Sequence, residues 1–408
     1  MWALSIFSAI TLFIHIFSIA IVARRIWMSP ATVGPMPIGK PPVSIVRPVC
    51  GLENNLAETL QSGFRLDWPQ FEIIFCAAAD DDPAIPVVER LIADHPGVAA
   101  RLLVGDNRVS VNPKLNNVVK GWNAARYDFI VIADSNVLAP PDFLQRLFAR
   151  WLPGTGMVCS PPAGSAPEGF WAEVECGWLN SFQARWQLCA DEIGLGFGQG
   201  KAMLLERHLL DRSGGIERLA EEVAEDAAAT KIVRAAGLNV RLTTEPFQQP
   251  LGRRTWSGIW RRQLRWARLR RASFPLYFAP EILTGGALPI LAAAVLVGFG
   301  HWPLWTAFVY AGAWYGVELF LTYLYRWPLS LRTPAALLLR DVALPALWTA
   351  AWFGNGFVWR GNQMAIVPAR HRRDRAGARS VKMRARTLRA GALNSIRRPV
   401  KLLRRKQL

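Results

Sequence analysis

The sequence predicts a doubly wound α/β domain that apolar helices attach to a membrane. Apolar runs of strand length alternate with helix-compatible stretches over residues 41–249, an uncharged apolar segment precedes this region, and further apolar segments follow it. The chain has 408 residues, of which 51% are hydrophobic and 11% aromatic. This composition excludes a disordered or collagen-like polymer.

Four apolar runs rich in Val, Ile and Phe have the length of buried parallel strands. They are residues 43–48, 71–79, 100–105 and 129–134. The stretches between them fit helices, at residues 56–62, 84–94 and 114–125. We therefore expect a sheet covered by helices, with ligands bound at the carboxyl ends of the strands.

The N-terminal segment predicts a transmembrane anchor over residues 1–25. Residues 2–23 have no formal charge and are long enough to cross about 30 Å of hydrocarbon as a helix. Arg24 and Arg25 follow the apolar run, whereas a cleaved signal peptide would begin with basic residues. The region after the anchor should therefore face the cytoplasm.

The late apolar region predicts about three further helices. Residues 282–317 have no formal charge, and His301-Trp302-Pro303 divides them into spans near 282–300 and 304–324. A third candidate covers 342–359, after the charged pair Arg340 and Asp341. Three late spans and one early span would place the basic tail outside, against the positive-inside rule. We expect the region around Arg340 and Pro345 to be re-entrant or interfacial.

The net charge of +18 is concentrated at the C-terminus, since residues 370–408 contain 15 Lys and Arg and one acid. Such a tail binds an anionic surface, either phospholipid or nucleic acid. No recognised nucleic-acid motif accompanies it, so anionic phospholipid is the expected partner and nucleic acid is not. The five cysteines form no Cys-x-x-Cys pair, which argues against a disulfide framework or a thiolate zinc site.

Acidic residues stand where the predicted strands end. Asp80, Asp81 and Asp82 follow the second run, Asp134 closes the fourth, and Asp226 begins a probable helix. Turn formation and N-capping are one explanation. The other is nucleotide-sugar chemistry, in which carboxylates and phosphates bind a divalent cation and a separate carboxylate acts as general base.

An arginine-rich segment follows the predicted domain. Residues 253–271 contain eight arginines, three tryptophans and no acid. On a helix, Arg261, Arg265 and Arg268 would share one side, with Arg262 and Trp266 on an adjoining stripe. Guanidinium groups suit pyrophosphate, and a basic amphipathic helix also suits an anionic lipid surface. Both explanations stay open, and both can hold together.

These motifs, in this order, resemble the membrane-bound ceramide glucosyltransferases, inverting enzymes with a catalytic domain of the GT-A type. The family pattern has three separated aspartates followed by Arg- or Gln-x-x-Arg-Trp, and the resemblance covers nearly the whole chain. The segments DDPAI, ADSN, AEDAAATK and RQLRW supply the matching residues: Asp82, Asp134, Asp226, Arg262, Arg265 and Trp266.

The resemblance implies a Rossmann-like mixed sheet and a division of the chain. The expected parts are a cytoplasmic GT-A domain over residues 41–249, an Arg- and Trp-rich interfacial segment over 250–281, a membrane region over 282–360 and a basic cytoplasmic tail over 361–408. We expect an integral protein of a bacterial inner membrane.

The resemblance also implies roles for the motif residues. Asp82 would contact the nucleotide, Asp134 would hold Mg²⁺ or Mn²⁺ and the pyrophosphate, and Asp226 would deprotonate the acceptor. The residues that would close over the diphosphate are Arg262, Arg265 and Trp266.

Two further residues are donor-binding candidates. Lys114, in NPKLNN, would contact the nucleotide or a phosphate, and Glu53, in CGLENN, would meet the uracil. The alternatives are a solvated helix-start lysine and a first-turn acid favoured by the helix dipole. Related glycosyltransferases have Asp-x-Asp where this chain has Asp134-Ser135-Asn136, and one carboxylate fewer predicts weaker metal binding.

The predicted reaction transfers a hexose from a UDP-sugar to the primary hydroxyl of ceramide with inversion, and glucose is the expected hexose. A second hypothesis keeps this chemistry and changes the acceptor to a hopanoid, diacylglycerol or polyprenyl phosphate. A third hypothesis is a membrane-tethered protein whose basic tail binds nucleic acid.

Overall fold

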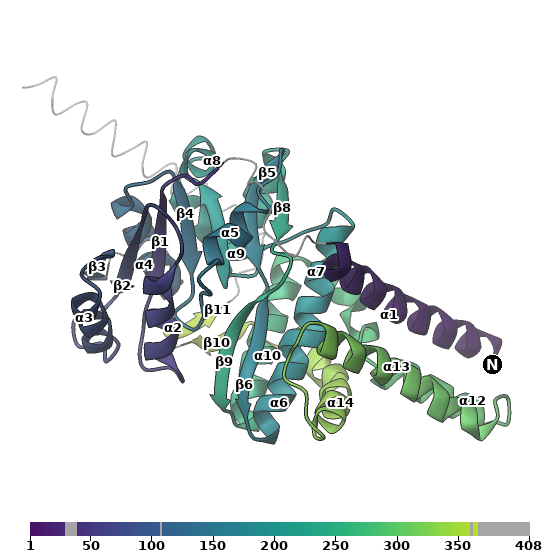
Figure 1. Ribbon diagram of the computed structural model, residues 1–408. Coiled ribbons are helices and arrows are strands. Elements are labelled where there is room, and N and C mark those ends of the chain that lie inside the picture. The colour runs from purple at the N-terminus through teal and green to yellow at the C-terminus, as the bar shows by residue number, and fades with distance from the viewer. Residues whose placement is uncertain (29–38, 107, 360–361, 366–408) are drawn as a thin grey trace, which may run out of the picture. The chain divides into compact units, whose positions relative to one another are not determined.

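The computed structural model of the chain describes residues 1–28, 39–106, 108–359 and 362–365. At its centre lies a seven-stranded mixed sheet in the order β3-β2-β1-β4-β7-β5-β8 (Figure 1). Strands β1 to β4 run parallel, and β7 runs antiparallel to its neighbours β4 and β5. The strands of this sheet are β1 (Val43–Pro48), β2 (Phe71–Ala77), β3 (Ala99–Val104), β4 (Phe129–Ala133), β5 (Thr155–Ser160), β7 (Ala202–Glu206) and β8 (Asn239–Leu242).

The four apolar runs of the sequence form β1 to β4, which confirms the predicted α/β class. Residues of β1, β2 and β4 are almost all buried, as their continuous apolar character predicts. The expectation of burial was wrong for β3, whose residues are exposed or half-buried. The reason is its place at the edge of the sheet, where one neighbouring strand and one covering helix leave much of it open to solvent.

Helices cover both faces of the sheet, because alternate strand residues point to opposite sides. One core joins α4 (Pro113–Ala124) and α9 (Glu225–Ala235) to Val46, Ile74 and Ile132. The opposite face packs against α2 (Leu56–Ser62), α3 (Ile85–Asp94) and α5 (Phe143–Phe148). The remaining short helical elements of this part are η1 (Gly63–Arg65), α8 (Arg207–Arg212) and η3 (Ile216–Glu221).

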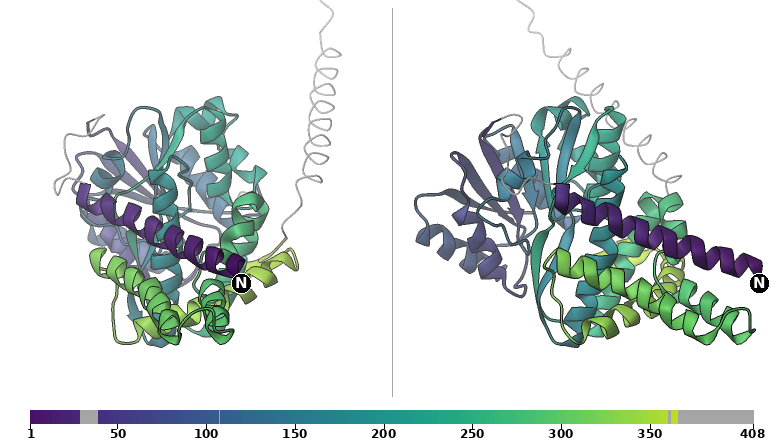
Figure 2. Two further views of the ribbon diagram at one scale, coloured as in Figure 1. Left: turned by 90° about the vertical axis from the view of Figure 1, so that its right-hand side faces the viewer. Right: turned by 45° about the vertical axis from the view of Figure 1, so that its right-hand side comes forward.

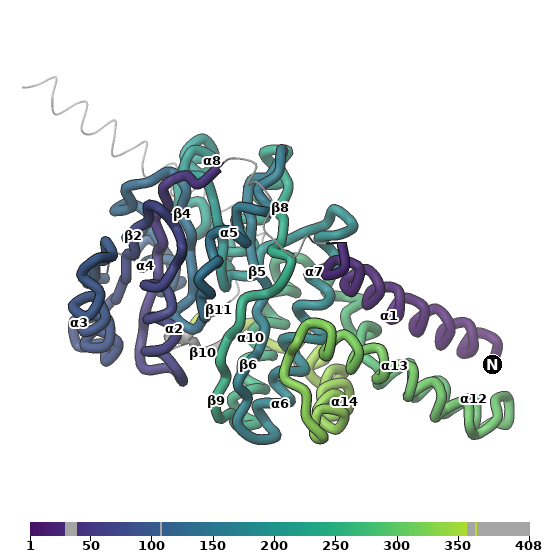
Figure 3. Tube along the Cα trace, in the orientation of Figure 1, coloured from purple at the N-terminus to yellow at the C-terminus, as the bar shows by residue number. Residues whose placement is uncertain are grey.

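A second layer lies between the large sheet and the apolar helices. The parallel pair β6 (Pro162–Glu168) and β9 (Phe247–Arg253) packs against the helix that follows β6 (Figure 3). That helix runs on through three consecutive elements, α6 (Phe170–Gly177), the π-helix η2 (Trp178–Ala184) and α7 (Arg185–Glu192). Helix α10 (Trp256–Ser273), which includes most of the arginine-rich segment, packs against α6.

The helical elements over the predicted membrane segments are α1 (Trp2–Met28), α11 (Pro275–Phe278), η4 (Ala279–Leu283), α12 (Ala287–Gly298), α13 (Leu304–Leu324) and α14 (Thr333–Trp352). Three described segments are long and apolar enough to cross a membrane, at residues 2–28, 275–298 and 333–352. Helices α1, α12 and α13 pack together and project from one side of the sheet, as two further views show (Figure 2). Helix α14 instead packs against α6 and α10.

The third late helix begins earlier and ends earlier than predicted. The sequence suggested 342–359 with a charged pair in front, but α14 runs from Thr333 to Trp352 and includes Arg340 and Asp341. The charges lie inside the helix because each has a partner. Both terminal nitrogens of Arg340 donate to Glu318 of α13, at 2.8 and 3.0 Å, and its Nε donates to Asp341 at 2.8 Å. A buried charge this close to opposite charges is tolerated in a membrane.

The same cluster extends to the N-terminal helix. The His15 ring on α1 stacks on Trp314, with ring centres 3.8 Å apart, and Arg185 Nη1 lies 2.8 Å from His15 Nδ1. The buried charges of Arg185 and Arg340 balance those of Glu318 and Asp341. This network ties α1, α13 and α14 to α7, so the membrane helices and the sheet domain form one unit over residues 1–354.

A second unit begins at Asn355. Its described part is an antiparallel hairpin of β10 (Gly356–Trp359) and β11 (Asn362–Ala365). The basic tail over residues 370–408, for which an anionic phospholipid partner is predicted, lies outside the described residues.

Candidate active site

The carboxyl ends of β1, β2 and β4 bring three of the predicted residues to one edge of the sheet. The Asp82 carboxylate, after β2, accepts the N–H groups of Gly51 at 2.8 Å and Ala84 at 2.9 Å, which ties its loop to the loop after β1. Two residues beyond Gly51, Glu53 accepts the Ser135 hydroxyl at 3.5 Å. Ser135 is next to Asp134, so hydrogen bonds join the loop of Asp82 to the loop of Glu53, and the loop of Glu53 to the loop of Asp134.

Asp134 lies between two lysines. Its Oδ1 is 2.6 Å from Lys114 Nζ and its Oδ2 is 2.9 Å from Lys201 Nζ. The antiparallel pairing of β4 with β7 places Lys201 here, because Ala133 pairs with Ala202 and the Asp134 N–H donates to the Lys201 carbonyl at 2.9 Å. Lys114 is in the first turn of α4, where the Asn112 side chain accepts its N–H at 3.0 Å and caps the helix.

The lysines keep Asp134 ionised. Burial by itself would raise the pKa of Asp134, but Lys114 and Lys201 outweigh burial and lower this pKa to about 2. Burial would likewise lower the pKa of Lys114, but Asp134 and Glu225 outweigh it and hold that pKa above its usual value. The group is therefore a stable cluster of charges at physiological pH.

Asp226 is the second residue of α9, on the other side of Lys114. Its Oδ2 accepts the Gly200 N–H at 2.7 Å and its Oδ1 accepts the Ala227 N–H at 2.7 Å. Burial, together with the neighbouring Glu225 carboxylate, raises the pKa of Asp226 to about 6. A carboxylate that titrates close to neutral pH is suited to accept a proton as a general base.

Lys114 and Gly200 connect the two aspartates. Lys114 Nζ pairs with Glu225, next to Asp226, at 2.7 Å. A side chain on Gly200 would place its Cβ 3.1 Å from Lys114 Nζ and 3.5 Å from Asp226 Oδ2, so only glycine leaves this contact unstrained. Asp134 and Asp226 therefore lie in one site.

Sequence reasoning missed two members of this site, Lys201 and Glu225. Glu225 directly precedes Asp226, which the sequence had singled out, and Lys201 directly follows a glycine-rich segment, GFGQG. The only signal for them was this adjacency.

Of the three predicted residues on α10, Trp266 lies next to the Asp134 cluster, whereas Arg262 pairs with a carboxylate of α6. The Trp266 ring centre is 5.8 Å from Lys201 Nζ, which brings the predicted lid next to the Asp134 cluster. Arg262 Nη1 pairs with Glu175 at 2.6 Å, and Arg254 pairs with the other oxygen of the same buried carboxylate at 2.8 Å. Arg265 lies between Arg262 and Trp266 on this helix and is half-buried.

Comparison with known proteins identifies the family. Residues 10–371 match glycosyl transferase family 21. The chain belongs to this family. Ceramide glucosyltransferase 1 of Caenorhabditis elegans is 27% identical over 345 residues, which span 80% of this chain and 72% of that protein. The ceramide glucosyltransferase of Komagataella phaffii is 44% identical over 107 residues, 25% of this chain and 21% of that protein.

A solved structure has a similar fold. Mannosyltransferase PcManGT from Pyrobaculum calidifontis, in complex with GDP-Man and Mn²⁺, aligns with a TM-score of 0.50 and 18% identity over 84% of this chain and 99% of that one. Together these comparisons confirm the predicted GT-A type fold and the predicted enzyme class. The chain is a glycosyltransferase, and three of its described helical segments are long and apolar enough to cross a membrane.

The family 21 enzyme offers few ligands for the predicted divalent cation. Among the described residues, no group of three or more His, Cys, Asp or Glu side chains is placed to hold a metal ion. Asp134 and Asn136 contribute one carboxylate and one amide oxygen. This set fits a cation whose other ligands are substrate phosphates and water, which is how proteins commonly bind Mg²⁺.

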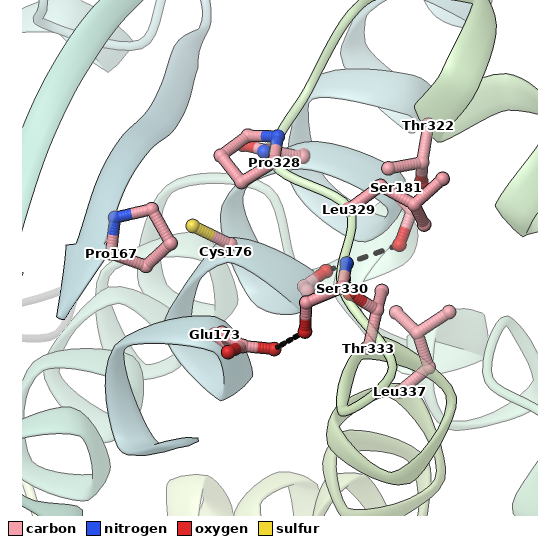
Figure 4. Close-up of a pocket in the computed structure, with 12 residues that line it drawn as sticks. Pro167, Glu173, Cys176, Ser181, Thr322, Pro328, Leu329, Ser330, Thr333 and Leu337 are labelled. Carbon is pink, nitrogen blue, oxygen red and sulfur yellow. Dashed lines mark hydrogen bonds between the residues drawn. The ribbon is translucent and has the colours of Figure 1, made fainter. Parts of the chain in front are cut away.

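A cavity of about 240 Å³ lies beside α6, and none of the three aspartates lines it (Figure 4). Glu173, Cys176, Gly177 and Asn180 line it from α6 and η2 at helical spacing, and the Ser330 hydroxyl donates to Glu173 at 2.6 Å across its rim. Its other lining residues are Pro167, Ser181, Thr322, Pro328, Leu329, Ser330, Thr333 and Leu337. None of the predicted site residues is among them.

Proposed function

We propose that this family 21 enzyme transfers a hexose from a UDP-sugar to the primary hydroxyl of ceramide, and that the hexose is glucose. The transfer proceeds with inversion at the cytoplasmic face of a bacterial inner membrane. The observation that carries this proposal is the different surroundings of two carboxylates in one site: Asp134 lies between two lysines, whereas Asp226 is held by backbone N–H groups. The pKa of Asp134 is lowered to about 2 between two lysines, whereas the pKa of Asp226 is raised to about 6. One stays anionic while the other accepts a proton near neutral pH.

This contrast matches the two tasks of a single-displacement glycosyl transfer. The acceptor oxygen forms a bond to C1 of the sugar as the bond from C1 to the diphosphate oxygen breaks. The diphosphate leaves with the bonding electron pair, and Asp226 takes the hydroxyl proton. Because attack comes from the face opposite the leaving group, the configuration at C1 inverts.

The donor lies, in this proposal, along the edge formed by the loops after β1, β2 and β4. Asp82 and Glu53 would meet the nucleotide, and Lys114, Arg262, Arg265 and Trp266 would surround the diphosphate. A divalent cation, when bound, would neutralise charge on the leaving diphosphate, and Asp134 with Asn136 would hold it.

The position of the site relative to the apolar helices supports a lipid acceptor. Helix α10 borders the site through Trp266 and also packs against α14. A water-soluble donor can therefore arrive from the cytoplasm while the chains of the acceptor stay in the bilayer. The names of the relatives favour ceramide, and a hopanoid, diacylglycerol or polyprenyl phosphate is the alternative acceptor.

The chemical identity of the glycolipid product tests this proposal. Purified protein in bilayers would receive a panel of UDP-sugars and GDP-mannose with each acceptor lipid, and the lipids would be analysed by mass spectrometry. We expect glucosylceramide, and the β-anomer from the α-linked donor. Absence of a glycolipid with every donor and acceptor would contradict the proposal.

The basic tail has a separate role in this proposal, as a contact to anionic phospholipid. Deletion of residues 370–408 should preserve glycosyl transfer and weaken binding to vesicles that contain anionic lipid, measured by flotation. Loss of nucleic-acid binding with no change in vesicle binding would favour the third hypothesis.

A further inference from the structure

Lys201 bridges the side chains of the first and third residues of the segment Asp134-Ser135-Asn136. Its Nζ donates to Asp134 Oδ2 at 2.9 Å and to Asn136 Oδ1 at 3.2 Å. The Lys201 side chain is 11% exposed and that of Asp134 is 19% exposed, so water screens the pair weakly. A positive charge thus sits where an Asp-x-Asp segment would hold a metal ion between its two carboxylates.

The second lysine of the site has a different set of partners. Lys114 Nζ lies 2.6 Å from Asp134 and 2.7 Å from Glu225, and it donates to the Gly200 carbonyl at 2.8 Å. These three acceptors match the three N–H groups of an ammonium. Lys114 is therefore a brace between β4 and α9, and a donor phosphate would have to displace one of these partners.

Lys201 has fewer side-chain partners than the ammonium of Lys114 has acceptors. Its two side-chain acceptors use two of its three N–H groups, and its charge lies 5.8 Å from the ring centre of Trp266 on α10. The ammonium therefore lies between the Asp134 cluster and the helix that the resemblance places over the diphosphate.

The local charges show what this ammonium does. Asp134, Glu225 and Lys114 alone sum to one negative charge, and the deprotonated Asp226 adds a second, so this group would repel a diphosphate. The ammonium of Lys201 offsets one of these two negative charges before any metal ion is present. The chain has an amide at Asn136 where an Asp-x-Asp segment has its second carboxylate, and the tertiary structure places a cation beside that position.

We propose that Lys201 is a donor-binding residue whose ammonium binds the diphosphate of the sugar nucleotide directly. The ammonium donates hydrogen bonds to the oxygens of Asp134 and Asn136 that a divalent cation would also use. The inference rests on the proposed function, since it assumes a nucleotide diphosphate donor. Two consequences follow: part of the donor affinity needs no metal, and the ammonium competes with the metal for the same oxygens.

Nucleotide binding without metal tests this inference. UDP would be titrated into the purified full chain in EDTA by isothermal calorimetry, for wild type, Lys201→Met and Lys201→Arg. The matched control is Lys231→Met on α9, whose side chain is 43% exposed and pairs with Glu222. We expect Lys201→Met to weaken UDP binding about tenfold or more, because it removes a charge-assisted contact. Lys201→Arg should keep most of the affinity and Lys231→Met all of it.

Mn²⁺ provides a second readout that a purely structural role would not change. Electron paramagnetic resonance of Mn²⁺ with UDP present should show tighter metal binding in Lys201→Met, because the competing ammonium is gone. Thermal unfolding would verify that each variant is folded. If Lys201→Met does not fold, Lys201→Gln serves instead, since its amide can still donate to Asp134 without carrying charge.

The outcomes separate this inference from the proposed function. Equal UDP affinity of wild type and the Lys201 variant in EDTA would overturn the inference and leave the proposed function standing. Wild-type binding that vanishes in EDTA and returns with Mn²⁺ would do the same. Wild type that binds GDP but not UDP, with or without Mn²⁺, would overturn the proposed UDP donor.

Discussion

Protonation of Asp226 should set the acid limb of the enzyme's pH profile. The free carboxyl has a pKa of 3.8, and burial with the adjacent Glu225 raises it to about 6 in the folded protein. A base must be deprotonated to act, so kcat/KM should rise with pH up to about 6 and level off above it. One unit below the pKa only about a tenth of the carboxyl is ionised, so the rate at pH 5 should be about tenfold lower.

The assay is the initial rate of lipid glycosylation in bilayers between pH 4.5 and 8, at donor concentrations below KM. Binding of the UDP-sugar measured over the same range is the control, because it lacks the terminal phosphate of UDP, which itself titrates at about pH 6. Asp134, with its pKa lowered to about 2, does not titrate there, so donor affinity should stay nearly constant. A rate that is flat from pH 5 to 7 would refute the assignment of Asp226 as base.

Removal of the base gives the matching genetic test. Asp226→Ala should lower kcat by about 100-fold to 10,000-fold, the usual contribution of a positioned general base. UDP affinity should change far less, because the carboxylate accepts N–H groups of Gly200 and Ala227 and no donor contact is assigned to it. The residual activity of Asp226→Ala should lack the acid limb near pH 6. Turnover equal to wild type would contradict the reasoning.

Three further perturbations test the site and the fold. Asp134→Ala should abolish the effect of Mn²⁺ on UDP affinity, because it removes the only carboxylate assigned to the metal; a persisting effect would show that the metal binds elsewhere. Arg340→Met leaves two buried carboxylates without their partner and should destabilise the protein by about 3–5 kcal/mol, seen as a lower unfolding midpoint in detergent, whereas the exposed Arg332→Met should not. Gly196→Ala would place a Cβ 2.1 Å from the Val240 carbonyl oxygen and should reduce folded yield, while Gly298→Ala, with nothing within 4 Å, should be silent.

Much of the fold could be predicted from local patterns. The apolar runs that became β1, β2 and β4 are buried on both faces, so they show continuous hydrophobicity whichever strand lies beside them. The antiparallel insertion of β7 between β4 and β5 was not predictable, because strand order depends on contacts between distant segments. The limits of α14 also escaped prediction, since Arg340 looks like a boundary until Glu318 of α13 is known to be its partner.

The candidate site was likewise predicted in part from the sequence. Motif order pointed to Asp82, Asp134 and Asp226, and the carboxyl-end rule for parallel strands gave the edge at which the first two should lie. Their roles as donor and base residues stay predictions. Only the neighbouring Glu225 gave a local sign that the pKa of Asp226 differs from that of Asp134, because the other causes are burial and, for Asp134, the distant residues Lys114 and Lys201.

The sequence by itself determined the α/β class, the membrane helices and the order of the aspartates, because each depends on residues near one another along the chain. Only the tertiary structure decided that Lys201 reaches Asp134 and Asn136, that Glu175 pairs with Arg254 and Arg262, and that Lys114 and Gly200 connect the two aspartates. Charge acts through space over a few ångströms, and the residues that set the electrostatics of this site are dozens of positions apart in the chain.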